Sequence, residues 1–226
     1  AVDWATAEWV ARGIAKRSSS TPASSSASIH RDYEELTAQA QTLVEAHTGW
    51  RSDAGLARAR VVDRDDWIRA NIASFRRMLR PLTDRLEEHL PAGPANFVAS
   101  RVAGAEMGAV LGWMSTRVLG QYDLLVLEDE DPDDQDIVYY VGPNIAALER
   151  RFDFPEREFR LWVALHEVTH RTQFTGKPWL RSYFLEQVNG LMTMADPDPA
   201  RFFAAIGRLA EAIRTRRNPL DDGGIV

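Results

Sequence analysis

Cysteine is absent from the 226 residues of this chain. Without thiols there is no disulfide framework, no thiolate metal site and no cysteine nucleophile. Any transition-metal site must then use histidine and carboxylate ligands, which suits zinc in a catalytic setting. Histidine is also scarce, with five in the whole chain, so two histidines at a metal-binding spacing are an informative signal.

Strong positive charge and long apolar runs are missing as well. The formal net charge is −6, so a large electrostatic interface for nucleic acid is not expected. No apolar run approaches the length of a membrane span, and the N-terminal residues have acids and no apolar core, unlike a signal peptide. We therefore expect a cytoplasmic protein without nucleic-acid or membrane partners. The sequence does not indicate an oligomeric state.

The remaining composition is that of a globular protein. Hydrophobic residues make up 45% of the chain and charged residues 27%, which is enough for a core. The length predicts one mainly helical domain over residues 1–226. A Ser/Ala tract at 18–28 is predicted to be a flexible linker, and residues 128–136 form a predicted acidic loop that includes Pro132.

Apolar periodicity predicts a mainly α fold with a small β-hairpin or sheet, an α+β class. Gly104, Gly108 and Gly112 recur every fourth residue of one apolar stretch, which predicts a buried helix packed closely on a neighbour. The other predicted helices are 3–17, 29–47, 63–79 with a continuation beyond Pro81, 156–175, 179–192 and 200–215. The predicted strands are 124–127 and 137–141, and the predicted turns are 120–123 and 142–144.

The strongest chemical signal is His166-Glu-Val-Thr-His170, an HExxH motif. Residues four apart lie one turn above each other on the same face of a helix, so two imidazoles can reach one metal ion. Glu167 lies at the flank of the pair, from where its carboxylate can accept a proton from a water on the metal without being a ligand. The alternative is two core histidines bonded to backbone carbonyls.

The helix that carries the motif has clear limits. Pro155 suits a first helical position, Glu156 and Glu158 complement the helix dipole, and Gly176 is a plausible stop. Apolar residues cover most of the circumference, which predicts a buried helix in the core. Histidines in such a helix need partners, and a metal ion would supply them.

Four stretches together resemble one family. They are Val61–Asn71, Val118–Asp123, Gly142–Asn144, and His166–Phe174 followed by Pro178-Trp-Leu. They are similar to the zincin-like, zinc metalloprotease-like hydrolases of actinobacteria and related bacteria, which are sometimes connected with deazaflavin coenzyme biosynthesis. The resemblance implies a zinc-dependent hydrolase with His166 and His170 as zinc ligands and Glu167 as the general base.

The resemblance also implies a third ligand from a glutamate on a later helix, in a Leu-Leu-Glu-Gly-His-like stretch that this sequence lacks. Glu186, on the next predicted helix, is the best candidate within the chain. Arg171, Tyr183 and Tyr122 are candidate donors to a developing oxyanion.

Three functions therefore compete. The first is a zinc metallopeptidase, or a hydrolase of another acyl bond. The second is a catalytically inactive zincin-like binding or structural protein, which a missing third ligand would favour. The third is a non-hydrolytic enzyme that uses the deazaflavin coenzyme, for which the sequence has no phosphate-binding loop.

Overall fold

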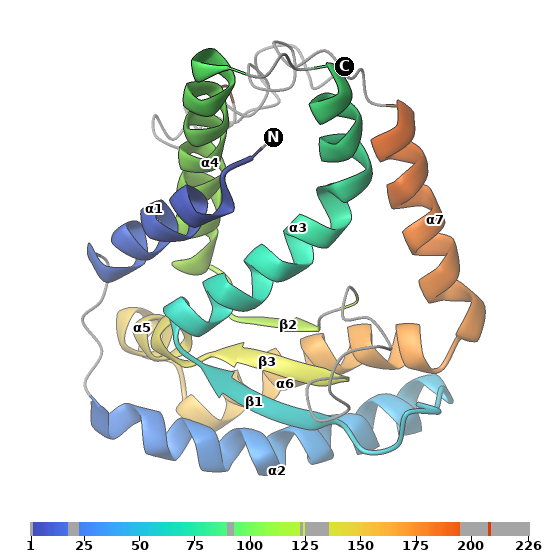
Figure 1. Cartoon of the computed structure of the whole chain (residues 1–226). Coiled ribbons are helices and arrows are strands. Elements are labelled where there is room, and N and C mark those ends of the chain that lie inside the picture. Colours follow the sequence, from blue (N-terminus) through green and yellow to red (C-terminus); the bar gives the residue numbers. More distant parts are fainter. Residues whose placement is uncertain are drawn as a thin grey trace. The chain divides into compact units, whose positions relative to one another are not determined.

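The structure, a computed structural model, describes residues 2–17, 23–89, 93–122, 124, 136–194 and 208. Over these residues the chain forms the helices α1 to α7 and three short strands (Figure 1). This confirms the predicted mainly helical fold with a small sheet. Internal contacts divide the chain into two compact units, so the expectation of a single domain stays a prediction. Unit 1 consists of Ala1–Ser18, Ile68–Thr116 and Gln187–Val226, and unit 2 of Ser19–Trp67 and Arg117–Glu186.

Unit 1 is built on the contact between α1 (Trp4–Arg17) and α4 (Pro94–Ser115). The main-chain amide of Thr6 donates to Asp3 Oδ1 at 2.9 Å, which caps the start of α1. The three glycines of α4 face α1 so closely that a Cβ on Gly104 would lie 2.2 Å from the Asp3 carbonyl oxygen. The fourfold glycine spacing therefore serves close packing of two helices, as predicted.

Helix α3 (Arg64–His89) begins in unit 2 and continues into unit 1. The main-chain amide of Asp66 donates to Asp63 Oδ1 at 2.8 Å, so Asp63 caps the helix. Pro81 lies inside the helix, which continues beyond it to His89.

Unit 2 contains a three-stranded sheet with the order β1 (Arg58–Val62), β3 (Ile137–Val141) and β2 (Gly120–Tyr122). Strands β1 and β3 are parallel, and β2 pairs with β3 in the antiparallel direction. Gly120 is opposite Tyr140, and Tyr122 is opposite Val138. These four residues consequently share one face of the sheet.

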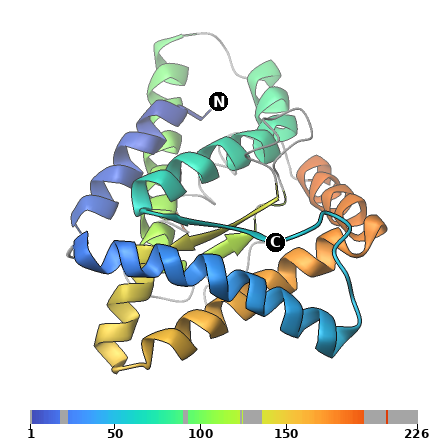
Figure 2. The same ribbon diagram turned by 90° about the horizontal axis from the view of Figure 1, so that it is seen from below.

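Two helices, α2 (Ala23–Thr48) and α6 (Glu156–Thr175), cover that face and cross each other, as Figure 2 shows. Helix α5 (Gly142–Phe152) follows β3 directly, and α7 (Pro178–Met194) follows α6. The core of the unit lies between the helices and the sheet. It contains Ile29, Tyr33, Leu36, Ala40 and Val44 of α2, Val138 and Tyr140 of β3, Ile145 and Ala146 of α5, and Val163, Ala164 and Val168 of α6.

Several local predictions are corrected. The predicted turn at 120–123 is strand β2 over residues 120–122, and the predicted turn at 142–144 is the first turn of α5, where Pro143 needs no amide partner. Helix α2 begins at Ala23, so the linker prediction at 18–28 is wrong for residues 23–28.

Residues 18–22 lie outside the described residues. So do residues 125–135, which include most of the predicted strand 124–127 and acidic loop 128–136, and all but residue 208 of the predicted helix 200–215.

No helix among the described residues combines the length and the apolar character that a membrane crossing requires.

Gly108→Ala should destabilise the chain by about 1–3 kcal/mol, because the new Cβ would lie 2.4 Å from the Ala7 carbonyl oxygen and force α1 and α4 apart. Gly13→Ala on α1 is the matched control. No atom lies within 4 Å of its added Cβ, so the helix propensity of alanine should stabilise the chain by about 0.5–1 kcal/mol. Urea unfolding of both variants measures the contrast, and equal effects would contradict the close-packing interpretation.

Candidate functional site

Helix α6 has the limits that the sequence predicts. It begins at Glu156 after Pro155 and ends at Thr175. Gly176 follows, and its amide donates to the Thr172 carbonyl at 2.9 Å. A Cβ on Gly176 would lie 2.4 Å from the Arg51 carbonyl oxygen, so a close backbone approach explains the glycine at this helix end.

The orientation of α6 differs from the prediction. His166 and His170 lie on the exposed face, and Trp162 is 58% exposed on the same stripe. The buried charged side chains are instead Arg160, Glu167 and Arg171. The expectation of buried histidines is therefore wrong. Burial consequently does not oblige them to take a metal partner.

The two histidines nevertheless have the geometry of a paired site. Their ring centroids lie 4.8 Å apart, with an angle of 83° between the ring planes. His170 Nδ1 lies 3.3 Å from Gln173 Oε1. Partial burial of the His166 ring, together with the neighbouring His170, lowers the pKa of His166. A lowered pKa favours the neutral imidazole, which is the form that ligates metals.

Glu167 lies on the inner side of the same helical turn. A Cβ on Gly120 of β2 would lie 2.6 Å from Glu167 Cγ and 2.8 Å from Glu167 Oε1. The backbone of β2 therefore covers the carboxyl group directly. Burial raises the pKa of Glu167 to about 7, and a carboxyl group with a pKa near neutrality is suited to accepting and returning a proton.

The role of Gly120 was missed from the sequence. Gly120 lies in the Val118–Asp123 stretch, where Gly-Gln-Tyr-Asp is typical of a turn. The family resemblance included this stretch, but nothing local showed that its glycine would face the motif. That contact exists only because β2 pairs with β3 and lies against α6.

The predicted oxyanion donors lie in different settings. Arg171 is fully buried, where its Nε donates to Asp136 Oδ1 at 2.9 Å and its Nη2 donates to the Gly55 carbonyl at 3.1 Å. Burial, with the charge of Asp136, raises the pKa of Tyr122 to about 12. Tyr183 is 52% exposed on α7, beside Trp179. Arg171 is therefore committed to holding the start of β3, and Tyr122 lies beside that pair.

A third ligand is not assembled with the histidines in the described part of the chain. Glu186 lies exposed on α7, and no group of three or more His, Asp or Glu side chains among the described residues is arranged to hold a metal ion. Two imidazoles beside a carboxyl group fit zinc by donor chemistry. Among the described residues the candidate site thus consists of two candidate ligands and a candidate base.

The whole chain, from residue 2 to residue 222, matches the family model of the zincin-like metallopeptidases. The chain belongs to the zincin-like metallopeptidase family. The crystal structure described as that of a putative hydrolase with a novel fold, from Chloroflexus aurantiacus, is similar with a TM-score of 0.69 and 29% sequence identity. The similarity covers 96% of this chain and 68% of that one. No curated protein matches the chain.

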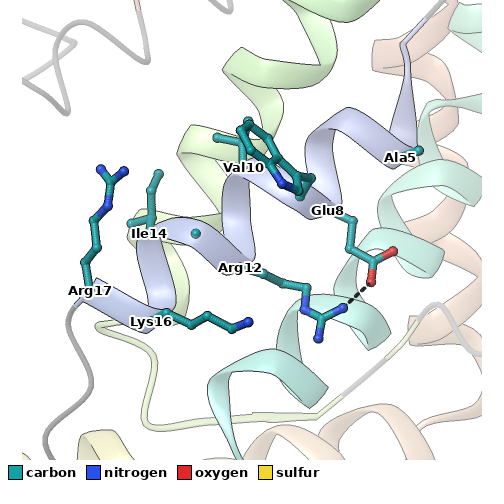
Figure 3. A pocket seen from close by; sticks show the side chains of 9 residues that line it. Ala5, Glu8, Val10, Arg12, Ile14, Lys16 and Arg17 are labelled. Carbon is teal, nitrogen blue, oxygen red and sulfur yellow. Dashed lines mark hydrogen bonds and ion pairs between the residues drawn. The ribbon is translucent and has the colours of Figure 1, made fainter.

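Unit 1 of this zincin-like chain carries a separate hollow of about 740 Å³ along α1 (Figure 3). Arg12 and Glu8 form an ion pair of 3.3 Å on its wall. The described residues that line it all belong to α1: Ala5, Glu8, Trp9, Val10, Arg12, Gly13, Ile14, Lys16 and Arg17.

Glu167 should make the stability of the metal-free chain depend on pH. Its folded-state pKa of about 7 lies above the ordinary value of 4.5, so ionisation destabilises the fold. The penalty is absent below about pH 4.5, grows as the pH rises and is complete above about pH 7. Glu167→Gln should remove about 3 kcal/mol of destabilisation at pH 8, since a pKa difference of one corresponds to about 1.4 kcal/mol.

Urea unfolding of both proteins from pH 4 to 8, with chelator present, measures this effect. The stability difference between Glu167→Gln and wild type should increase steadily towards pH 7 and then stay constant. A difference that is the same at pH 4 and pH 8 would show that the Glu167 carboxyl group is not held in a low-dielectric site.

Proposed function

We propose that this chain is a zinc-dependent hydrolase, specifically a metallopeptidase, in which His166 and His170 hold the metal ion and Glu167 is the general base. One observation carries the proposal: an exposed, paired set of histidines shares a helical turn with a buried glutamate whose pKa is about 7. The family membership and the hydrolase described for the Chloroflexus structure support it.

Each group of the motif has a distinct task in this mechanism. The exposed imidazoles of His166 and His170 would hold zinc, which acts as a Lewis acid that lowers the pKa of water. Glu167 accepts the proton of the attacking water and later returns it to the leaving amine. The β2 backbone at Gly120 covers one side of the carboxyl group.

An inactive zincin-like binding or structural protein is the second candidate. It is favoured by the lack of a three-ligand group in the described part of the chain. Zinc content separates it from the hydrolase, because a scaffold without metal needs neither histidine.

Wild-type protein purified without chelators should contain about one zinc per chain, and His166→Ala and His170→Ala should lose it. Glu167→Gln should keep the zinc but lower kcat for peptide hydrolysis about 10²- to 10⁴-fold, because it removes the general base and no ligand. Metal analysis and single-turnover assays measure both quantities.

Loss of zinc in Glu186→Ala would identify the third ligand. A wild-type chain that binds no zinc when supplied with it would leave the scaffold as the better function.

Gly120→Ala tests the position of the base rather than its identity. The added Cβ would lie 2.6 Å from Glu167 Cγ and must push the carboxyl group away. Zinc content should stay near that of wild type, because the new methyl group contacts neither histidine. The rate should fall about 100-fold, the usual effect of displacing a catalytic group by about 1 Å. Full activity in this variant would exclude the arrangement of β2 and Glu167 as a catalytic feature.

A further inference from the structure

An unbroken series of aromatic rings leads along the surface of unit 2 to the histidine pair. Phe152, Phe154, Phe159 and Trp162, which we call the aromatic ladder, have successive ring centroids 5.4, 4.9 and 6.0 Å apart. The Trp162 ring is followed by His166 at 6.2 Å. Three of the four rings are well exposed, at 52% for Phe152, 40% for Phe154 and 58% for Trp162.

We propose that the aromatic ladder is the substrate-binding surface that receives large apolar side chains of a peptide next to the bond to be cleaved. The inference rests on the proposed function, because it assigns the substrate of the same site. It adds a class of peptide, rich in aromatic and large aliphatic residues, and it names Trp162 as the residue that sets this preference.

Packing against the core of unit 2 supports the ladder. Phe159 is partly buried and packs against the core of unit 2. Trp162 lies one turn before His166 on the same stripe of α6, which the core residues Val163 and Val168 hold on the sheet. The exposed rings consequently need no rearrangement to bind, so little conformational entropy is lost when a ligand covers them.

The position of the ladder favours a substrate over another occupant of the same surface. A peptide whose scissile carbonyl reaches the histidine pair must extend over neighbouring surface. The helical turn before His166 presents the Trp162 ring there. Bulky apolar side chains of the peptide would cover this ring and bury apolar area against it.

The three exposed rings alone offer less area than a stable contact with a second copy requires. A fully exposed aromatic side chain offers roughly 150–250 Å², so three rings that are about half exposed offer roughly 300 Å². A stable protein interface buries about 800 Å² on each partner. The ladder instead matches the contact area of a few side chains of a bound peptide.

The first test compares peptides that differ only in Phe or Ala at positions flanking the cleaved bond, with zinc-loaded protein. Wild type should prefer the Phe peptide about 10- to 100-fold in kcat/KM, as expected for burying one aromatic side chain. Trp162→Ala should reduce this preference about tenfold at unchanged zinc content, and Trp162→Phe should retain most of it. Trp9→Ala is the matched control, because Trp9 on α1 is an exposed tryptophan (77%) that is not a member of the ladder.

The second test measures binding without turnover. Calorimetry with Glu167→Gln should give a Kd about tenfold lower for the Phe peptide than for the Ala peptide, and Trp162→Ala in that background should abolish the difference. Phe154→Ala gives an independent check at a different ring, and thermal unfolding confirms that each variant is folded.

The outcomes separate the two proposals. If wild type cleaves peptides but Trp162→Ala keeps the full preference for Phe, the ladder proposal is overturned and the hydrolase stands. If no peptide is cleaved but binding of the Phe peptide depends on Trp162, the ladder stands as a peptide site and the hydrolase fails. If Trp162→Ala dissolves a dimer in sedimentation experiments and changes no peptide affinity, a second copy is the occupant and the ladder proposal is overturned.

Discussion

Two buried arginines fix the rotation of α6 about its own axis, and the candidate site depends on that rotation. Arg160 donates two hydrogen bonds to Glu149, at 2.7 and 3.0 Å, and also pairs with Asp32 of α2. Arg171, three turns later on the same stripe, pairs with Asp136 at the start of β3. Removing one partner of a buried ion pair costs about 3–5 kcal/mol. Turning α6 would break both ion pairs, so the histidine stripe, which lies about 100° around the helix axis from the arginines, is held towards solvent.

Because of this rotation, adjacent residues of one helical turn lie in two different environments. Glu167 shares the inner stripe with the arginines but has no ion-pair partner among the described residues; it lies against the backbone of β2 at Gly120. Burial without a countercharge explains why the pKa of its carboxyl group rises to about 7. His166, the preceding residue, lies on the exposed face. Adjacent residues thus place the proposed base against the β2 backbone and the proposed ligands on the exposed face.

The sequence predicts the features of this site that depend on neighbouring residues, and it misses those that depend on contacts with distant residues. Pro155 and Gly176 mark the limits of α6, and the spacing of the histidines places them on one face. The rotation of the helix was not predictable from periodicity. The partners of Arg160 and Arg171 lie up to 128 residues away, and a large apolar side chain such as Trp162 is exposed while the arginines are buried. Gly120 was misread because a strand of three residues has no detectable period.

The position of the histidines relative to the core bears on the kind of metal site that this chain can form. The core cluster of unit 2 is made of apolar side chains from α2, β3, α5 and α6, and neither His166 nor His170 contributes to it. A structural zinc site is closed by four ligands and replaces part of a core, so that folding depends on the metal. Two histidines on the exposed face of a helix that is already fixed by ion pairs leave room for a water and a substrate. If zinc binds here, the arrangement fits a catalytic site better than a structural one, because the fold does not depend on the metal.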